Sequence, residues 1–139
     1  MVLANGCFDL IHAGHIRYLK GARMCGDILV IALNGDSSVT RLKGPGRPIL
    51  NQNQRAEILS AFDCVDYITV FHENDVSRIL LSLKPDIHAK GSDYTEETVP
   101  EKDVVNSYGG RVTIVGGPKI KSTSEIILEI SQKTNEDTK

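Results

Sequence analysis

Residues 5–15 read NGCFDLIHAGH, and this stretch decides how the remaining chain is interpreted. It follows a short apolar run at residues 2–4, which we predict to be a β-strand, and it leads into apolar residues at helical spacing. Gly6 permits a tight turn after the strand, and Gly14 lets the backbone approach a ligand closely because it has no side chain. A strand, a glycine-containing loop and a helix start in this order predict a ligand site at the end of a parallel strand.

The rest of the chain alternates between strand-like and helix-like segments. The continuous apolar run at residues 28–33 is typical of a strand buried on both faces. Further strands are predicted at residues 67–71, 87–89 and 112–115, and helices at residues 52–61, 75–83 and 122–130. This alternation predicts a Rossmann-like α/β fold, a five-stranded parallel sheet with helices on both faces. Residues 1–130 are expected to form a single domain, followed by a polar tail at residues 131–139.

The composition excludes several classes of protein. The chain has 139 residues, with 16 Lys and Arg against 18 Asp and Glu, so its net charge of −2 argues against a nucleic-acid partner. No apolar run approaches the roughly 18 residues of a membrane span, so no membrane partner is expected. Three scattered cysteines form no disulfide framework and predict reduced thiols in a cytoplasmic protein.

His12 and His15 are the strongest candidates for chemistry. They are three residues apart at a helix start, so both rings can face one side. The unpaired N–H groups and positive dipole end of a helix N-terminus favour a phosphate, and two imidazole donors would stabilise further negative charge. Two alternatives remain. The histidines could simply be exposed at a helix start, or they could bind a metal with Cys7, although no fourth ligand has recognisable spacing.

A second helix start is predicted at Ser122, Thr123 and Ser124. Ser122 and Glu125 fit a capping box, which requires no function. That structural explanation leaves the other hydroxyls and two nearby lysines unexplained. Two helix N-termini facing one crevice would suit a polyphosphate ligand.

Residues 41–48, RLKGPGRP, are predicted to be a mobile cationic loop. Such a loop could fold over a triphosphate and neutralise a leaving pyrophosphate, or it could simply be solvated. Arg55 opens the following helix. It could reach the same phosphates or pair with Glu57 or Asp63.

Polar residues also follow the predicted fourth strand. Gly91 allows close approach, and Asp93 could hold a ribose hydroxyl, a sugar or Mg²⁺. Asp9 is another possible indirect metal holder. Neither the dinucleotide-binding glycine motif nor the phosphate-binding loop motif is present, which argues against a dehydrogenase or a P-loop kinase.

The motifs described above resemble those of a known family. Residues 6–15 resemble the HxGH signature of the nucleotidyltransferase superfamily, and residues 122–124 resemble its second, Ser-Thr-containing motif. Within that superfamily, residues 41–44, 46–49 and 90–94 (RLKG, GRPI and KGSDY) are most similar to the heptose 1-phosphate adenylyltransferase domain. The resemblance spans nearly the whole chain.

The resemblance also implies roles for individual residues. Catalytic roles are implied for His12, His15 and Lys43, and no resident metal ligand is implied. Substrate contacts are expected from Asp9, Asp36 and Arg47. Nucleotide contacts are expected from a larger set: Asn5, Gly6, Cys7, Phe8, Gly14, Arg55, Lys90, Gly91, Asp93, Ser122, Thr123 and Ser124.

The expected reaction is adenylyl transfer from ATP, with Mg²⁺ on the triphosphate, to a sugar 1-phosphate such as D-glycero-D-manno-heptose 1-phosphate. Relatives often carry a fused sugar kinase. Because the sequence begins almost on the first strand, the heptose is expected to arrive already phosphorylated. Relatives commonly form homodimers. The alternatives are a cytidylyltransferase acting on glycerol 3-phosphate or a similar alcohol phosphate, and a non-catalytic nucleotide-binding module.

Overall fold

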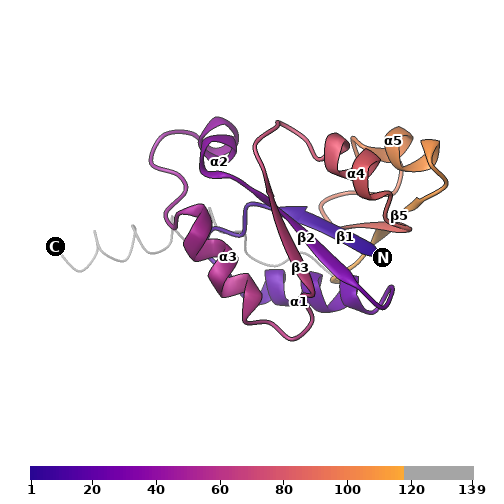
Figure 1. Ribbon diagram of the computed structural model, residues 1–139, viewed down its shortest axis with the longest axis horizontal. Coiled ribbons are helices and arrows are strands. Elements are labelled where there is room, and N and C mark those ends of the chain that lie inside the picture. Colours follow the sequence, from indigo (N-terminus) through magenta and orange to yellow (C-terminus); the bar gives the residue numbers. More distant parts are fainter. Residues whose placement is uncertain (118–139) are drawn as a thin grey trace, which may run out of the picture.

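The computed structural model, described here for residues 1–117, contains a parallel β-sheet of five strands (Figure 1). In spatial order the strands are β3-β2-β1-β4-β5. Their bounds are β1 (Val2–Gly6), β2 (Leu29–Asn34), β3 (Tyr67–Phe71), β4 (Ile87–Lys90) and β5 (Arg111–Ile114). The predicted five-stranded parallel α/β fold is therefore confirmed, with strand bounds that differ from the predicted ones by at most two residues.

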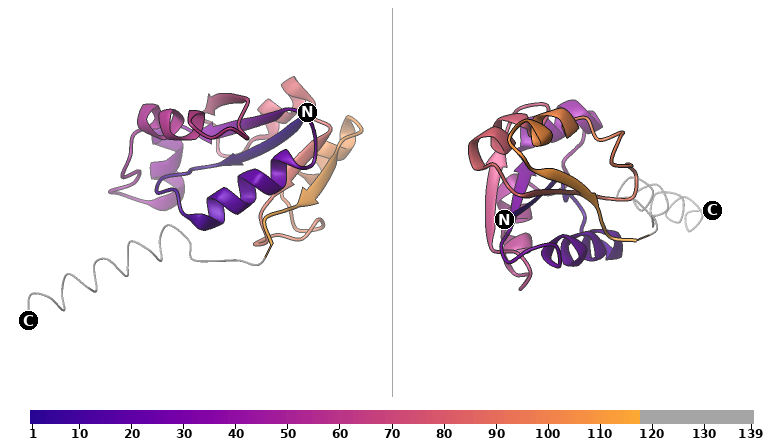
Figure 2. Two further views of the ribbon diagram at one scale, coloured as in Figure 1. Left: turned by 90° about the horizontal axis from the view of Figure 1, so that it is seen from below. Right: turned by 90° about the vertical axis from the view of Figure 1, so that its right-hand side faces the viewer.

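Helices cover both faces of the sheet (Figure 2). On one face lie α1 (Ala13–Arg23) and α3 (Gln52–Ser60), and on the other lie α4 (Ser77–Leu83) and α5 (Lys102–Ser107). The short helix α2 (Asp36–Lys43) follows β2 directly. Among residues 1–117, no helix is long and apolar enough to cross a membrane.

The inner strand β2 explains why both faces of the sheet are covered. Leu29, Ile31 and Leu33 pack into the core beneath α1 and α3, whereas Val30 and Ala32 pack into the core beneath α4 and α5. All of its residues are buried, as the continuous apolar run predicts. Alternate side chains point to opposite faces of a strand, so each face requires its own layer of helices.

Two helices were not predicted. The expected cationic loop at residues 41–48 is wrong for residues 41–43, which form the last turn of α2. Serine, threonine and valine are weak helix formers, so this segment shows no clear helical signal in the sequence. It ends at Gly44, whose φ of 97° suits glycine, and the loop begins there. The second missed helix, α5, has only six residues, too few for a clear periodic pattern.

The strand order creates a crevice between β1 and β4. The chain proceeds outward from β1 to β2 and β3, then returns to the other side of β1 for β4 and β5. Backbone pairing of β1 with β4 ends at Ala4 and Ala89. Beyond it, the Asn5 N–H donates to the Tyr18 hydroxyl (3.3 Å), which donates to the Ala89 carbonyl (2.6 Å). Ligands of open α/β sheets bind at such a topological switch point.

Helix α1 packs closely against the segment after β5, and this contact yields a stability prediction. Gly116 has a φ of 92°, and an added Cβ would lie 3.2 Å from the Tyr18 Cα atom. Gly116→Ala is therefore expected to lower the free energy of unfolding by more than about 1 kcal/mol, measured by thermal unfolding. Gly117→Ala is the matched control, because its φ is also positive, at 69°, but its Cβ would meet nothing within 4 Å. Equal losses in the two variants would contradict a packing role for Gly116.

Candidate active site

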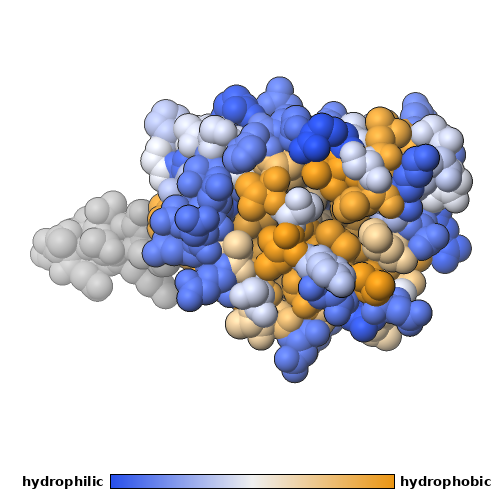
Figure 3. Space-filling model, viewed as in Figure 1, coloured by the Kyte–Doolittle hydropathy of each residue, from blue (hydrophilic) through white to orange (hydrophobic). Residues whose placement is uncertain are grey.

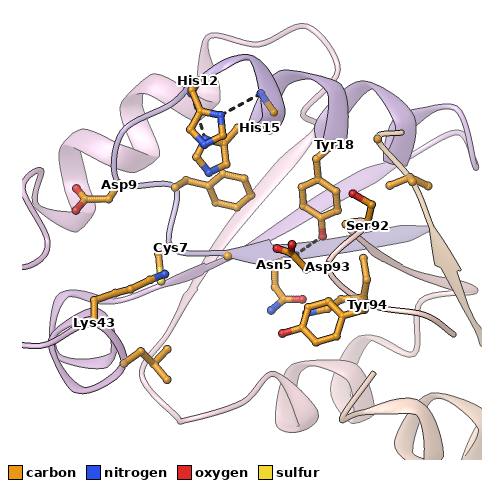
Figure 4. Close-up of a pocket in the computed structure, with 18 of the residues that line it drawn as sticks. Asn5, Cys7, Asp9, His12, His15, Tyr18, Lys43, Ser92, Asp93 and Tyr94 are labelled. Atoms are coloured by element: carbon orange, nitrogen blue, oxygen red, sulfur yellow. Dashed lines mark hydrogen bonds between the residues drawn. The ribbon is translucent and has the colours of Figure 1, made fainter. Parts of the chain in front are cut away.

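A cavity of about 540 Å³ opens at the carboxyl ends of β1 and β4 (Figure 4). Its walls come from the loop after β1, the first turns of α1, the end of α2, the loop after β4 and the segment after β5. The lining residues are Asn5, Gly6, Cys7, Phe8, Asp9, His12, Gly14, His15, Tyr18, Leu42, Lys43, Arg47, Lys90, Gly91, Ser92, Asp93, Tyr94, Val115, Gly116 and Gly117.

His12 and His15 form the cap of α1. The Gly14 N–H donates to His12 Nδ1 (3.0 Å), and the His12 N–H donates to His15 Nδ1 (3.2 Å). This is a capping box built from histidines in place of the usual Ser or Thr and Glu. Because Nδ1 is the acceptor in both rings, the proton of each neutral imidazole is on Nε2. The ring centroids are 4.0 Å apart, so the rings lie on one side of the helix as their spacing predicts.

His15 is neutral at physiological pH. Burial lowers its pKa to about 4, and the neighbouring His12 and Lys43 contribute to the shift. The Phe8 ring packs against it with centroids 5.3 Å apart. Phe8 has a φ of 48°, a left-handed conformation that non-glycine residues rarely adopt. His15 can therefore donate a hydrogen bond from Nε2 without carrying a charge.

Asp9 holds the cationic loop against the cavity. Its carboxylate accepts hydrogen bonds from the Arg47 guanidinium (2.9 Å) and from the backbone N–H groups of Ile49 and Leu50. Burial alone would raise the pKa of Asp9, but these hydrogen bonds outweigh it and lower the pKa. Asp9 and Arg47 both line the cavity, yet they bind each other.

The Asp9 contacts predict a change in nucleotide binding. Asp9→Asn removes the charge that binds Arg47, so we expect the loop to be less ordered and the KM for nucleotide to rise roughly tenfold. Because the native pKa lies below the ordinary value of about 3.9, the contribution of Asp9 to stability is complete above that pH and is lost as the pH falls through the native pKa. Tryptic cleavage after the exposed Lys43, at the start of this loop, reports its order. An unchanged KM and cleavage rate in Asp9→Asn would contradict this role.

Arg55 and Asp36 lie behind the cavity and do not line it. Arg55 is fully buried and donates to the carbonyls of Cys7, Asn34 and Leu50 and to the Asp36 carboxylate. Its ionic partner is Asp36 rather than Glu57 or Asp63. These contacts fix the loop after β1 relative to β2 and α3. The direct contact of Arg55 with phosphate that the sequence suggested stays a prediction.

The β4 side of the cavity is polar. Lys90 ends β4 with only 9% of its surface exposed, and its Nζ atom lies 4.6 Å from the centroid of the Tyr94 ring. Burial lowers the pKa of Lys90, and Glu101 partly offsets this effect. Lys90 and Asp93 both line the cavity. Figure 4 shows Asp93 across it from His12 and His15.

Most of the predicted site residues converge on this cavity. Ser122, Thr123 and Ser124 lie outside the described residues. The sequence analysis missed several lining residues: Tyr18, Leu42, Ser92, Tyr94, Val115, Gly116 and Gly117. Tyr18 could have been found, since it follows His15 by three residues and so shares its helix face. The segment after β5 lies at the end of a predicted strand, where ligands of such sheets bind, but only the sheet order brings it beside α1.

The metal alternative gains no support from the geometry. Among residues 1–117, no three His, Cys, Asp or Glu side chains are grouped closely enough to hold a metal ion.

Comparison with known proteins identifies the family of this chain. The cytidylyltransferase-like family matches residues 3–132. The chain is 51% identical over 130 residues to the bifunctional protein HldE of Syntrophotalea carbinolica, covering 94% of this chain and 26% of that protein. For HldE of Trichlorobacter lovleyi the identity is 46% over 137 residues, covering 99% and 28%. The chain thus spans about a quarter of the length of these curated relatives.

A solved structure also resembles the chain. The lipopolysaccharide core biosynthesis protein from Thermoplasma volcanium superposes with a TM-score of 0.69 at 34% identity, covering 86% of this chain and 97% of that one. The family match, the fold and the histidine-capped helix agree. The chain therefore belongs to the cytidylyltransferase-like family.

Proposed function

We propose that the protein transfers AMP from ATP to a sugar 1-phosphate, D-glycero-D-manno-heptose 1-phosphate, and releases pyrophosphate. The observation that carries the proposal is a single cavity lined by His12 and His15, each protonated on Nε2, and by Lys43 and Lys90. Figure 4 shows the two histidines and Lys43 at this cavity. The choice of nucleotide and acceptor rests on the resemblance of residues 41–44, 46–49 and 90–94 to the heptose 1-phosphate adenylyltransferase domain.

The reaction needs charge stabilisation more than proton transfer. An anionic oxygen of the acceptor phosphate attacks the α-phosphorus of ATP in line. The bond from that phosphorus to the bridging oxygen breaks, and the electron pair leaves with pyrophosphate. Because the nucleophile is already an anion, no general base is required. His12 and His15 donate from Nε2 to the reacting phosphoryl group, and Lys43 neutralises the phosphates.

We propose that Mg²⁺ enters as the complex with ATP. The described residues contain no group of three ligands that would hold a resident ion, whereas the triphosphate itself supplies oxygen ligands. Its contribution when bound is to neutralise charge on the triphosphate.

The test is pyrophosphate release by the purified protein with Mg²⁺, with ATP, CTP, GTP and UTP each combined with heptose 1-phosphate and glycerol 3-phosphate. Release confined to ATP with heptose 1-phosphate is the expected result. Release with CTP and glycerol 3-phosphate would replace this proposal by the cytidylyltransferase alternative, which the family description also allows. No release with any pair would contradict the proposed substrates.

We also propose that the protein forms a homodimer through the apolar face in Figure 3. This face surrounds β3, an edge strand of the sheet, on which Tyr67 is 64% exposed. Large exposed apolar areas on small proteins commonly mark interaction sites. Light scattering coupled to size-exclusion chromatography is expected to give twice the chain mass, and Tyr67→Lys is expected to give a monomer.

A further inference from the structure

A buried histidine contacts the floor of the cavity. His88, in the middle of β4, has no exposed surface, and its Nε2 atom lies 2.8 Å from Oδ1 of Asn5 on the adjacent strand β1. Its Nδ1 atom is buried and has no hydrogen-bond partner among residues 1–117. His88 does not line the cavity, but Asn5 does.

Hydrogen-bonding rules select one arrangement of this pair. If Nε2 carries the proton, it donates to Asn5 Oδ1, and only a lone pair on Nδ1 is left unpaired. The reverse arrangement, with the Asn5 amide donating to Nε2, would leave a buried N–H without an acceptor. Buried N–H groups are rarely left unpaired, so the first arrangement is favoured. Burial and the nearby Lys90 lower the pKa of His88 to about 3, so the ring stays neutral at physiological pH.

The contact determines which end of the Asn5 side chain faces the ligand. The backbone of Asn5 is held by the Tyr18 hydroxyl, and its side-chain oxygen is held by His88. The remaining NH₂ group is directed toward the side of the cavity where Lys43 lies (Figure 4). Without a donor at residue 88, the amide could rotate by half a turn and present its oxygen to an anionic ligand.

We propose that His88 is a positioning residue that holds the Asn5 carboxamide with its NH₂ group toward the cavity, as a hydrogen-bond donor to the bound phosphates. Donors that are oriented before the ligand arrives require no reorganisation on binding. The identity of the phosphates rests on the proposed function. The orientation of the amide does not.

Two substitutions separate positioning from a merely structural role. His88→Leu keeps an apolar side chain in a buried strand and removes the donor, so we expect an unchanged or higher Tm. We expect its kcat/KM to fall roughly three- to tenfold, mainly through a weaker affinity for nucleotide. His88→Gln retains an N–H donor at a similar reach and is expected to remain within about twofold of the wild type.

A double-substitution cycle tests whether His88 acts through Asn5. In the Asn5→Ala background, His88→Leu should cause no further loss in kcat/KM. Full activity of His88→Leu, failure of His88→Gln to restore activity, or additive losses in the cycle would overturn the inference.

Two further measurements keep this result separate from the proposed function. The dissociation constant of ATP with Mg²⁺, measured by calorimetry for the same variants, reports the phosphate contact even if no acceptor is turned over. A long-range proton–nitrogen NMR spectrum identifies the protonated ring nitrogen of His88. A proton on Nδ1 would overturn the inference whatever the substrate.

Discussion

Replacing His12 by asparagine, or His15 by glutamine, is expected to lower kcat by roughly 10²–10³-fold while α1 remains capped. Asn and Gln can accept the same backbone N–H bonds that the two Nδ1 atoms accept. The protein itself contains this arrangement, since Asn51 and Gln54 form the capping box of α3. Each substitution therefore keeps the cap but displaces the donor, because the cap fixes the carboxamide oxygen and its NH₂ group no longer lies where the imidazole Nε2 was. Single-turnover and steady-state pyrophosphate release measure the loss.

The alanine variants provide the control. His12→Ala should lose the donor and also about 1 kcal/mol of cap stability, whereas His12→Asn should keep the cap and only displace the donor. Since the pKa of His15 is lowered to about 4, kcat should show no inflection from His15 between about pH 6 and pH 9. Near-normal kcat in His12→Ala or His15→Ala, which carry no side-chain donor, would contradict donation to the reacting phosphoryl group.

Arg55→Met is expected to lower the free energy of unfolding by about 3–5 kcal/mol, the largest stability effect we predict. The guanidinium is fully buried, and its removal leaves the carbonyls of Cys7 and Asn34 without these donors. Asp36 would also lose its ionic partner. Chemical denaturation measures the loss, and the slope against denaturant should stay unchanged.

Two other substitutions test the geometry of this contact. Arg55→Lys keeps the charge, but one ammonium group cannot make the forked contacts, so it should restore little stability. Arg78→Met removes an arginine whose ion pair with Glu73 is exposed, and it should change stability little. If Arg55→Met and Arg78→Met were equally stable, the buried contacts of Arg55 would not be structural determinants.

Much of the fold was predictable because the strands have strong local signals. The run at residues 28–33 is apolar throughout, and β3 coincides with the predicted residues 67–71. Helix α2 was not predictable in the same way. Its residues have weak helix propensity, and it is stabilised by contacts distant in sequence, such as the hydrogen bond from Asp36 N–H to Gln52.

The residues of the candidate site were likewise predictable only in part. The residues of the NGCFDLIHAGH stretch were predictable because they are consecutive and surround one helix start. The structural role of Arg55 was not predictable from the sequence. Its charge suggested a phosphate ligand, but its burial and four acceptors depend on how α3 packs against the loop after β1.

The sequence by itself determined the parallel α/β fold, the location of the candidate site after the first strand, and the two histidines, because strand burial, turns and helix starts are local properties. The tertiary structure alone decided which cations reach the cavity and which are buried as supports. It also brought Tyr18 and His88 to Asn5, residues that are 13 and 83 positions away in the chain. Their contacts depend on the order of the strands, which places β4 beside β1, and no local pattern specifies that order.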